Sequence, residues 1–230
     1  PADLQPPAPR PPITGSDAAT AVATLDVDEV TKAVLEQIST DAAFAEMVAA
    51  KLIGKDAFFA VPSEELIAQD ETFEVEFKST ARWNLVESRK DKRMEDGVVK
   101  TIAGFQNADG GTLFLGIDND RNPLGLAPDC AVVRPTNLDG FLNWLTEHLI
   151  RAIGHAATMR TRARFEVIGG YDVCRVDVAR SSVPLRAQMS EKADVFWVRM
   201  SNTTRAWPDA EIEQYVKDHW GQDGMQFRAL

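Results

Sequence analysis

Apolar residues fall on every second position between residues 72 and 78, which is the spacing of a half-buried β-strand. The period then lengthens to that of a helix, up to a glycine-containing turn at residues 107–111. The apolar positions of this helix are Met94, Val98, Ile102 and Phe105. Residues 112–117 are apolar almost throughout, as in a strand covered on both faces. The pattern therefore predicts a strand, a helix and a second strand.

Further elements follow along the chain. Ser63 can cap a short helix over residues 64–68, and Thr136 or Asn137 can cap a longer one that ends at Gly154. Two alternating runs, residues 162–168 and 171–178, are separated by Gly169 and Gly170, which is typical of a hairpin. A last strand over residues 195–200 and a helix from Pro208 complete an α+β fold, with a mixed, largely antiparallel sheet flanked by helices.

The first 60 residues have a different character. Residues 1–15 are rich in proline and predict a disordered linker. Residues 16–60 contain two short amphipathic helices, at about 28–38 and 42–53, that form an acidic arm for packing on the main domain or for oligomerisation. The main domain is expected over residues 61–222, with a tail at 223–230.

The formal charge of −10 argues against a general nucleic-acid-binding protein until it is divided along the chain. Residues 1–70 carry 12 acidic and 4 basic side chains, whereas residues 71–230 carry 23 and 21. The acidity belongs mostly to the N-terminal part. Cys130 and Cys174 are far apart in the sequence, no zinc-like spacing occurs, and no run is long enough for a membrane span. We therefore expect a cytoplasmic location, with no contact to a membrane.

Carboxylates gather at the strand ends. Glu74 and Glu76 share one face of the first strand at about 7 Å, and Lys78 follows on the same face. Asp118 and Asp120 come directly after the second strand. Such oxygen ligands bind Mg²⁺ or Mn²⁺, and these ions promote phosphodiester hydrolysis. Lys78 is either a catalytic residue, which orients water or contacts phosphate, or a surface partner of Glu76. The acidic group is either an active site or a solvated strand face.

Basic residues gather in three places that either bind phosphate or are simply solvated. Residues 79–93 form a polar loop that contains an aromatic residue for base stacking. A stripe lies on one face of the strand that begins near residue 160, and a polar turn lies near residues 199–205. The candidates for contacts with nucleic acid are Arg82, Trp83, Arg89, Lys90, Lys92, Arg93, Arg160, Arg162, Arg164, Arg199, Asn202 and Arg205.

Several motifs in a fixed order resemble the Schlafen AlbA-type domain of bacterial proteins. The matching motifs are Glu71-x4-Glu76-Phe77-Lys78, Arg82-Trp83-Asn84, Lys100-Thr101-Ile102-Ala103-Gly104-Phe105-Gln106-Asn107, Gly110-Gly111-Thr112-Leu113, Gly116-Ile117-Asp118 and Leu124-Gly125-Leu126. Weaker identity continues to Trp220, so the resemblance covers residues 64–220. The order of the motifs carries the assignment, because each fragment alone occurs by chance in many chains.

The resemblance implies a metal-dependent endoribonuclease that cuts structured RNA such as tRNA, with Glu71, Glu76 and an aspartate at position 118 or 120 as the acidic residues. Two features of this chain differ from the family pattern. Asn119 stands where a second consecutive acid is common, and Glu71 lies about 16 Å from Glu76 unless the chain bends near residues 70–73. Such a bend is therefore a structural condition for a shared metal.

Other functions stay open. The first alternative is a non-catalytic DNA-binding, RNA-binding or regulatory module, and the second is nucleotide (ATP) binding at the 107–111 turn. Metal dependence separates the nuclease from the binding module, whose affinity should fall with added salt. Because the resemblance implies a groove between two lobes and this chain carries one set of motifs, we expect a homodimer, with RNA favoured over DNA.

Overall fold

The computed structural model describes residues 61–68, 71–191 and 194–221. These residues belong to the second of two compact units of the chain, Phe58–Leu230. The proline-rich linker, the acidic arm and the C-terminal tail that the sequence predicts lie outside the described residues.

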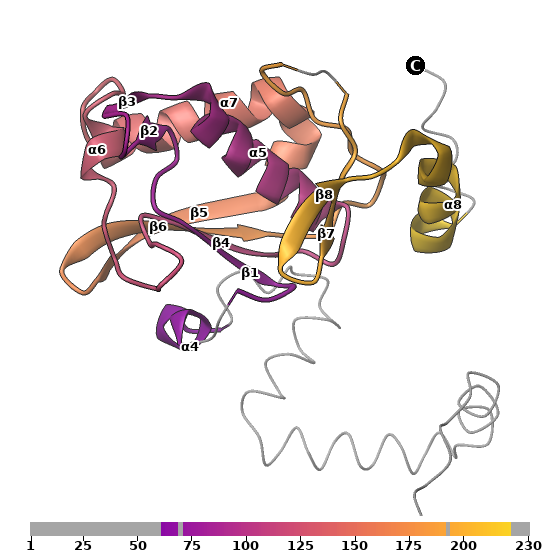
Figure 1. Cartoon of the computed structure of the whole chain (residues 1–230), viewed down its shortest axis with the longest axis horizontal. Helices are drawn as coiled ribbons and strands as arrows, with labels where there is room; N and C mark the ends of the chain where they lie inside the picture. Colours follow the sequence, from indigo (N-terminus) through magenta and orange to yellow (C-terminus); the bar gives the residue numbers. More distant parts are fainter. Residues whose placement is uncertain (1–60, 69–70, 192–193, 222–230) are drawn as a thin grey trace, which may run out of the picture. The chain divides into compact units, whose positions relative to one another are not determined.

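A four-stranded sheet forms the centre of the described domain (Figure 1). Its strands, in spatial order, are β1 (Val75–Lys78), β4 (Gly111–Leu115), β6 (Tyr171–Val178) and β5 (Thr161–Ile168). β1 and β4 are parallel, and the other two pairs are antiparallel. The predicted mixed, largely antiparallel sheet and the hairpin at Gly169 and Gly170 are therefore confirmed.

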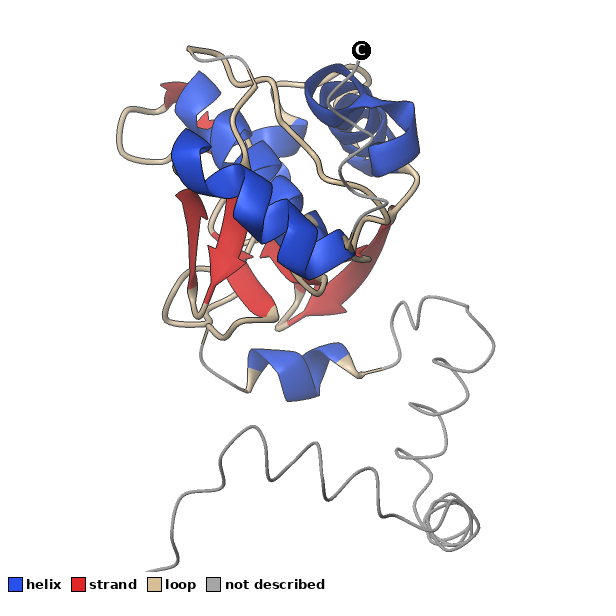
Figure 2. Ribbon diagram, turned by 90° about the vertical axis from the view of Figure 1, so that its right-hand side faces the viewer, coloured by secondary structure: helices blue, strands red, loops and turns tan. Residues whose placement is uncertain are grey.

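Two long helices, α5 (Lys92–Gln106) and α7 (Leu138–Thr158), cover one face of this sheet (Figures 1 and 2). Their apolar sides and the strands form the main core, which includes Ile102, Phe105 and Leu145. α7 continues for one turn beyond the end that the sequence predicts. Gly154 leaves helical geometry there, with φ 79° and ψ 166°, so the glycine produces a kink within the helix.

The short helix α4 (Ser63–Ile67) packs on the opposite face of the sheet, where Leu66 and Ile67 contact the cluster around Phe77. The predicted capping role of Ser63 is not observed, because the helix has no side-chain cap. The Ser63 hydroxyl instead accepts a hydrogen bond from Arg175, at 3.0 Å. Arg175 is 2% exposed and forms an ion pair with Asp177 on the same strand.

Two small antiparallel pairs of strands extend from this core. β2 (Trp83–Asn84) pairs with β3 (Arg89–Lys90), and β7 (Trp197–Met200) pairs with β8 (Thr203–Ala206). The helix α8 (Asp209–Trp220) packs against β7 through Phe196, Val198 and Ile212, and the one-turn α6 (Ala127–Cys130) precedes α7. Among the helices of the described ranges, none is long and apolar enough to cross a membrane.

Candidate nucleic-acid interface

A tight turn before β1 returns the chain onto itself. The Thr72 hydroxyl accepts hydrogen bonds from the amides of Glu74 and Val75, at 3.1 and 3.2 Å, and the Thr72 amide donates to the Val75 carbonyl. The strand therefore begins at Val75 and not at Thr72. Glu71 accepts a hydrogen bond from the Phe77 amide at 3.2 Å, which places its carboxylate beside the backbone next to Glu76. The bend that a shared role of these two glutamates requires is present.

Glu76 lies between two cations. Lys78 donates to one carboxylate oxygen at 2.9 Å, and Arg199 donates to the other. The Glu76 side chain is 14% exposed, and burial alone would raise its pKa. The positive charges and hydrogen bonds of Lys78 and Arg199 outweigh burial and hold the pKa of Glu76 below its ordinary value. Glu76 is therefore ionised at neutral pH and engaged on both oxygens.

Arg199 is a buried positioning residue. Its guanidinium also donates to the carbonyls of Thr72 and Val75, at 2.6 and 3.0 Å, so it fastens the turn and Glu76 to β7. The residue is 2% exposed. The expectation that Arg199 contacts nucleic acid directly is corrected, because the residue is buried and both terminal nitrogens of its guanidinium bond the surrounding backbone and Glu76.

Asp118 and Asp120 follow β4, as expected, but Asp118 closes a turn of its own. Its two carboxylate oxygens accept hydrogen bonds from the amide and the side chain of Asn122, at 2.8 and 3.2 Å. The hydrogen bond from the Asn122 amide, followed by that from its side chain, holds the pKa of Asp118 below its ordinary value. Asp120 is exposed.

The acidic residues do not fit a divalent cation as they are arranged. Glu71, Glu76 and Asp118 each have a protein hydrogen-bond donor on the carboxylate. Within the described ranges, no group of three or more His, Cys, Asp or Glu side chains is placed to hold a metal ion. We therefore derive no catalytic step through a metal.

Four cations lie on α5 or on the strands that pack beside it, and we call them the α5 strip. Arg93 and Lys100 belong to α5, Lys78 to β1 and Arg205 to β8. Positions 93, 97 and 100 share one face of the helix. Gly97 leaves this face open for the stem of Lys78, whose Cε would lie 3.8 Å from a Cβ at position 97. Lys100 lies 5.1 Å from the Trp197 ring, where α5 meets β7.

The charges of the α5 strip influence one another. Burial lowers the pKa of Lys100, and the positive charges of Lys78, Arg199 and Arg205 lower it further, whereas Glu76 opposes them. Such mutual repulsion is relieved when an anion approaches. Lys100 was not among the predicted contact residues. The one sequence feature that could have indicated it is its place at the start of the Lys100 to Asn107 motif. The charged residues around Lys100 are distant in the sequence and come together only in the fold.

The loop predicted for residues 79–93 contains an ordered hairpin. β2 and β3 pair in it, with Trp83 opposite Lys90. Arg82 at its base is 5% exposed, donates to Glu95 at 3.1 Å, and lies 4.4 Å from the centre of the Trp144 ring. Arg82 is therefore a buried structural residue, which corrects its predicted role in nucleic-acid contact. Other cations of this segment stay exposed, namely Arg89, Lys90, Lys92 and Arg93.

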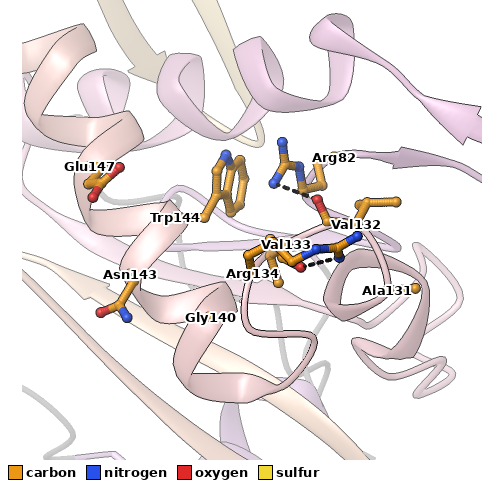
Figure 3. A pocket seen from close by; sticks show the side chains of 9 residues that line it. All are labelled: Arg82, Ala131, Val132, Val133, Arg134, Gly140, Asn143, Trp144 and Glu147. Atoms are coloured by element: carbon orange, nitrogen blue, oxygen red, sulfur yellow. Dashed lines mark hydrogen bonds between the residues drawn. The ribbon is translucent and has the colours of Figure 1, made fainter.

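A pocket of about 570 Å³ opens beside the base of this hairpin (Figure 3). Arg82 and Trp144 form one wall of it, and Arg134, Asn143 and Glu147 reach it from the loop after α6 and from α7. Arg82 and Arg134 donate to the carbonyls of Val132 and Val133. Sequence reasoning missed this pocket, because residues from 82 to 147 meet there only in the fold.

The arginine stripe of β5 lies on the opposite side of the sheet from Glu76. Through the strand register, Arg162 aligns with Asp177 on β6 and with Thr112 on β4, whereas Glu76 aligns with Leu113, the next residue of β4. Because successive residues of a strand point to opposite faces, Arg162 and Glu76 lie on opposite sides of the sheet. Arg164 forms an ion pair with Glu166 at 2.5 Å. Arg160 precedes the strand and donates to the Arg180 carbonyl and the Ser182 hydroxyl, both at 3.0 Å. The sequence correctly grouped Arg162 and Arg164 on one face. Because this face and the α5 strip lie on opposite sides of the sheet, one straight stretch of nucleic acid cannot contact both.

The turn at residues 107–111 is occupied by protein atoms. Asn107 is fully buried and exchanges hydrogen bonds with Leu185 in both directions, at 2.7 and 2.9 Å. It also donates to the Trp197 carbonyl and accepts from the Tyr215 hydroxyl. A Cβ on Gly110 would lie 2.6 Å from the Val178 carbonyl oxygen. The turn is therefore a structural junction, and its geometry does not favour nucleotide binding. At the other end of β7, Asn202 is exposed in the turn before β8.

Comparison with known proteins gives one family match. The family described as Schlafen, AlbA_2 matches residues 71–208. No curated protein matches the chain. Among the matching solved structures is the DIP2311 protein from Corynebacterium diphtheriae, which is 18% identical with a TM-score of 0.50 over 72% of this chain. The chain spans 29% of that protein, and the likeness concerns the fold alone. Another match is the N-terminal domain of a RecG-related protein from Nitrosomonas europaea, at 25% identity and a TM-score of 0.35, over 51% of this chain and 69% of that one.

Proposed function

Because the chain belongs to the Schlafen, AlbA_2 family, we propose that it binds nucleic acid and that the α5 strip holds the phosphate backbone. The observation that carries the proposal is that Lys78, which pairs with Glu76, and Lys100, which lies 5.1 Å from the centre of the Trp197 ring, meet where α5 packs on β1 and on the β7–β8 pair that carries Arg205. Glu76 and Arg199 give this junction a fixed shape, and the half-buried Lys78 and Lys100 together with the exposed Arg205 give it an excess of positive charge.

A helical row of cations is suited to a linear anion. Seven residues separate Arg93 from Lys100, which corresponds to about 10 Å along the helix axis. Contacts of this kind release counterions, so the binding constant falls as the salt concentration rises. On duplex DNA a plot of log K against log salt concentration has a slope of about −0.9 for each phosphate contact. The strip would therefore supply affinity with little sequence preference.

The test compares two opposite faces of the sheet. Labelled tRNA, single-stranded RNA and duplex DNA are titrated with the protein at several salt concentrations. In the strip variant Lys78, Lys100 and Arg205 are replaced by Gln, and in the control variant Arg162 and Arg164 are. We expect the strip variant to bind more weakly, with a salt slope shallower by about 3, while the control keeps the wild-type slope. Equal loss in both variants, or loss only in the control, would overturn the assignment to the strip.

A metal-dependent endoribonuclease is our second candidate, with Mg²⁺ or Mn²⁺ as the ion and structured RNA such as tRNA as the substrate. The turn that places the Glu71 carboxylate on the backbone amide of Phe77, one residue from Glu76, supports it, and binding of the ion would require both carboxylates to exchange their present donors for the metal. Glu71→Gln is the sharper variant for the test, because Glu76 also neutralises a buried arginine. Cleavage of tRNA that requires Mn²⁺ or Mg²⁺, stops with EDTA and disappears in Glu71→Gln at unchanged affinity would establish the nuclease. Binding without cleavage by the wild-type protein would leave the binding function alone.

We further propose a homodimer, since one chain carries one α5 strip and the family resemblance implies a groove between two lobes. RNA is favoured over DNA on the same resemblance. A cytoplasmic location agrees with the free thiols of Cys130 and Cys174, the second of which is buried. Light scattering with and without tRNA tests the dimer, and a monomer of unchanged mass in both samples would contradict it.

A further inference from the structure

The β2–β3 hairpin ends in two apolar side chains that point away from the domain. Val86 is 93% exposed and Leu85 is 47% exposed. All residues from 85 to 90 are exposed, so the tip rests on no other described part of the molecule. Neither residue contributes to the core or to the α5 strip.

Hydrogen bonds nevertheless give the tip a fixed shape. The Asn84 side-chain oxygen accepts from the amides of Val86 and Glu87, at 3.0 and 2.9 Å. The same side chain donates to Asp91 at 3.0 Å, and the Asp91 amide donates to the Arg82 carbonyl at 2.9 Å. Ser88 takes a left-handed conformation, with φ 48°, to close the turn. A rigid apolar tip avoids the entropy cost of ordering when it binds.

The base of the hairpin is fastened to the domain. The Asp129 carboxylate, which is fully buried, accepts hydrogen bonds from the amides of Ala81, Arg82 and Trp83 at 2.8 to 2.9 Å. Arg82 pairs with Glu95 in α5 behind it. The hairpin is therefore rigidly coupled to α5, which carries the strip.

Positive charge surrounds the apolar tip. Of the five basic side chains in residues 79–93, Arg82 is buried against Glu95, which leaves four exposed cations beside the two acidic residues of the segment. Glu87 pairs with Arg89 and Arg93, so these guanidinium groups lie alongside the tip rather than extending freely. Lys90 and Lys92 are exposed as well. An apolar tip with cations behind it matches the stacked bases and outer phosphates of a nucleic-acid duplex.

We propose that Leu85 and Val86 form a wedge that enters a double-stranded stretch of nucleic acid and separates two stacked base pairs. Apolar wedges on basic proteins act in this way at steps that unstack easily. This inference rests on the proposed function, since the α5 strip holds the backbone while the hairpin reaches the bases. It adds a substrate feature, namely a duplex with a flexible step, a bulge or a frayed end.

The test uses a duplex with 2-aminopurine, a base whose fluorescence rises when it is unstacked, next to a single-base bulge. The Leu85→Ser, Val86→Ser double variant is compared with the wild type, and Val167→Ser is the control, because Val167 is 73% exposed on β5. We expect the wild type and the control to raise the fluorescence on binding. The wedge variant should bind about tenfold more weakly, give no fluorescence rise and keep the wild-type salt slope, since its cations are unchanged.

Each failure has its own signature. If wild type and wedge variant bind equally and give equal fluorescence, the wedge is overturned and the α5 strip stands. If the wild type binds no RNA or DNA at any salt concentration, both proposals fall. Vesicles of phosphatidylserine and phosphatidylcholine form the last arm. Binding to them that depends on Leu85 and Val86, with no unstacking of the duplex, would reassign the tip to a membrane surface and overturn the wedge.

Discussion

At the scale of single residues, the candidate site depends on one buried arginine. Arg199 binds two carbonyls of the turn before β1 and the carboxylate of Glu76. The family resemblance indicated Glu71 and Glu76 as a pair and strand spacing showed that they require a bend, whereas spacing alone favoured Glu74 and Glu76. It could not show that Arg199 would be enclosed by them, because the two partners are 123 residues apart.

Replacement of Glu76 should make stability less sensitive to acid. In Glu76→Gln we expect a loss of about 2 kcal/mol at pH 7, because Arg199 loses its charged partner. Since the folded pKa of Glu76 lies below its ordinary value of 4.5, its contribution is complete above that pH and disappears as the pH falls through the folded pKa. Urea unfolding from pH 7 to 3 measures it. A difference between wild type and variant that does not shrink below about pH 4.5 would contradict this assignment.

Asn107 illustrates a motif residue with a structural role. Its side chain bonds Leu185 and Trp197, and its carbonyl accepts the Tyr215 hydroxyl. We expect Asn107→Ala to lower the free energy of unfolding by about 3 kcal/mol, since buried polar partners are left unsatisfied. Asn143→Ala, at an exposed position, is the control and should change it by less than about 0.5 kcal/mol. A small effect of Asn107→Ala in urea unfolding would argue against this junction.

At the scale of elements, periodicity predicted α5, α7 and the β5–β6 hairpin, since long amphipathic segments carry a strong local signal. The β2–β3 hairpin was missed. Its strands are two residues long, and its shape comes from Asn84, Asp91 and Asp129 rather than from alternation. The tertiary partners of such an element are decided elsewhere in the chain, so that pattern alone cannot indicate it.

Two glycines of α5 should respond oppositely to alanine. A Cβ at Gly104 would lie 2.4 Å from Thr204 Cγ2, because β8 packs directly on the helix there. We expect Gly104→Ala to destabilise the protein by about 1–2 kcal/mol, the cost of overpacking reduced by the better helix propensity. At Gly97 the nearest atom is 3.8 Å away, so Gly97→Ala should stabilise it by up to about 1 kcal/mol. Thermal unfolding measures both, and two changes of the same sign would contradict the packing of β8 on α5.

At the scale of the whole domain, the sheet separates two charged faces. Glu76 and the α5 strip occupy the side of α5, whereas Arg162 and the buried Arg175–Asp177 pair occupy the side of α4. The sequence placed Arg162 and Arg164 on one face but gave no information on which other cations lie across the sheet. Strand order and register decide that question.

The pair on the α4 side should be important for stability. Arg175 also donates to the Val61 carbonyl at 2.7 Å, which fastens the start of α4 to β6. We expect Arg175→Met to cost about 3–5 kcal/mol, because Asp177 keeps a buried charge without its main partner. Arg164→Met, at the exposed position opposite Arg175, should cost less than about 1 kcal/mol. Denaturant unfolding of both variants checks this, and similar costs would contradict a dominant role for burial.

The carboxylate in the middle of the α5 strip has a kinetic consequence. Glu76 is an anion that already engages Lys78, so a phosphate that approaches this end of the strip competes with a neighbour that is permanently attached. When a phosphate leaves Lys78, the ion pair between Lys78 and Glu76 forms again at once. Recapture of the same phosphate is therefore slowed. We therefore expect short residence times on nucleic acid, which suits a domain that samples many sites in succession rather than one that remains on a single site.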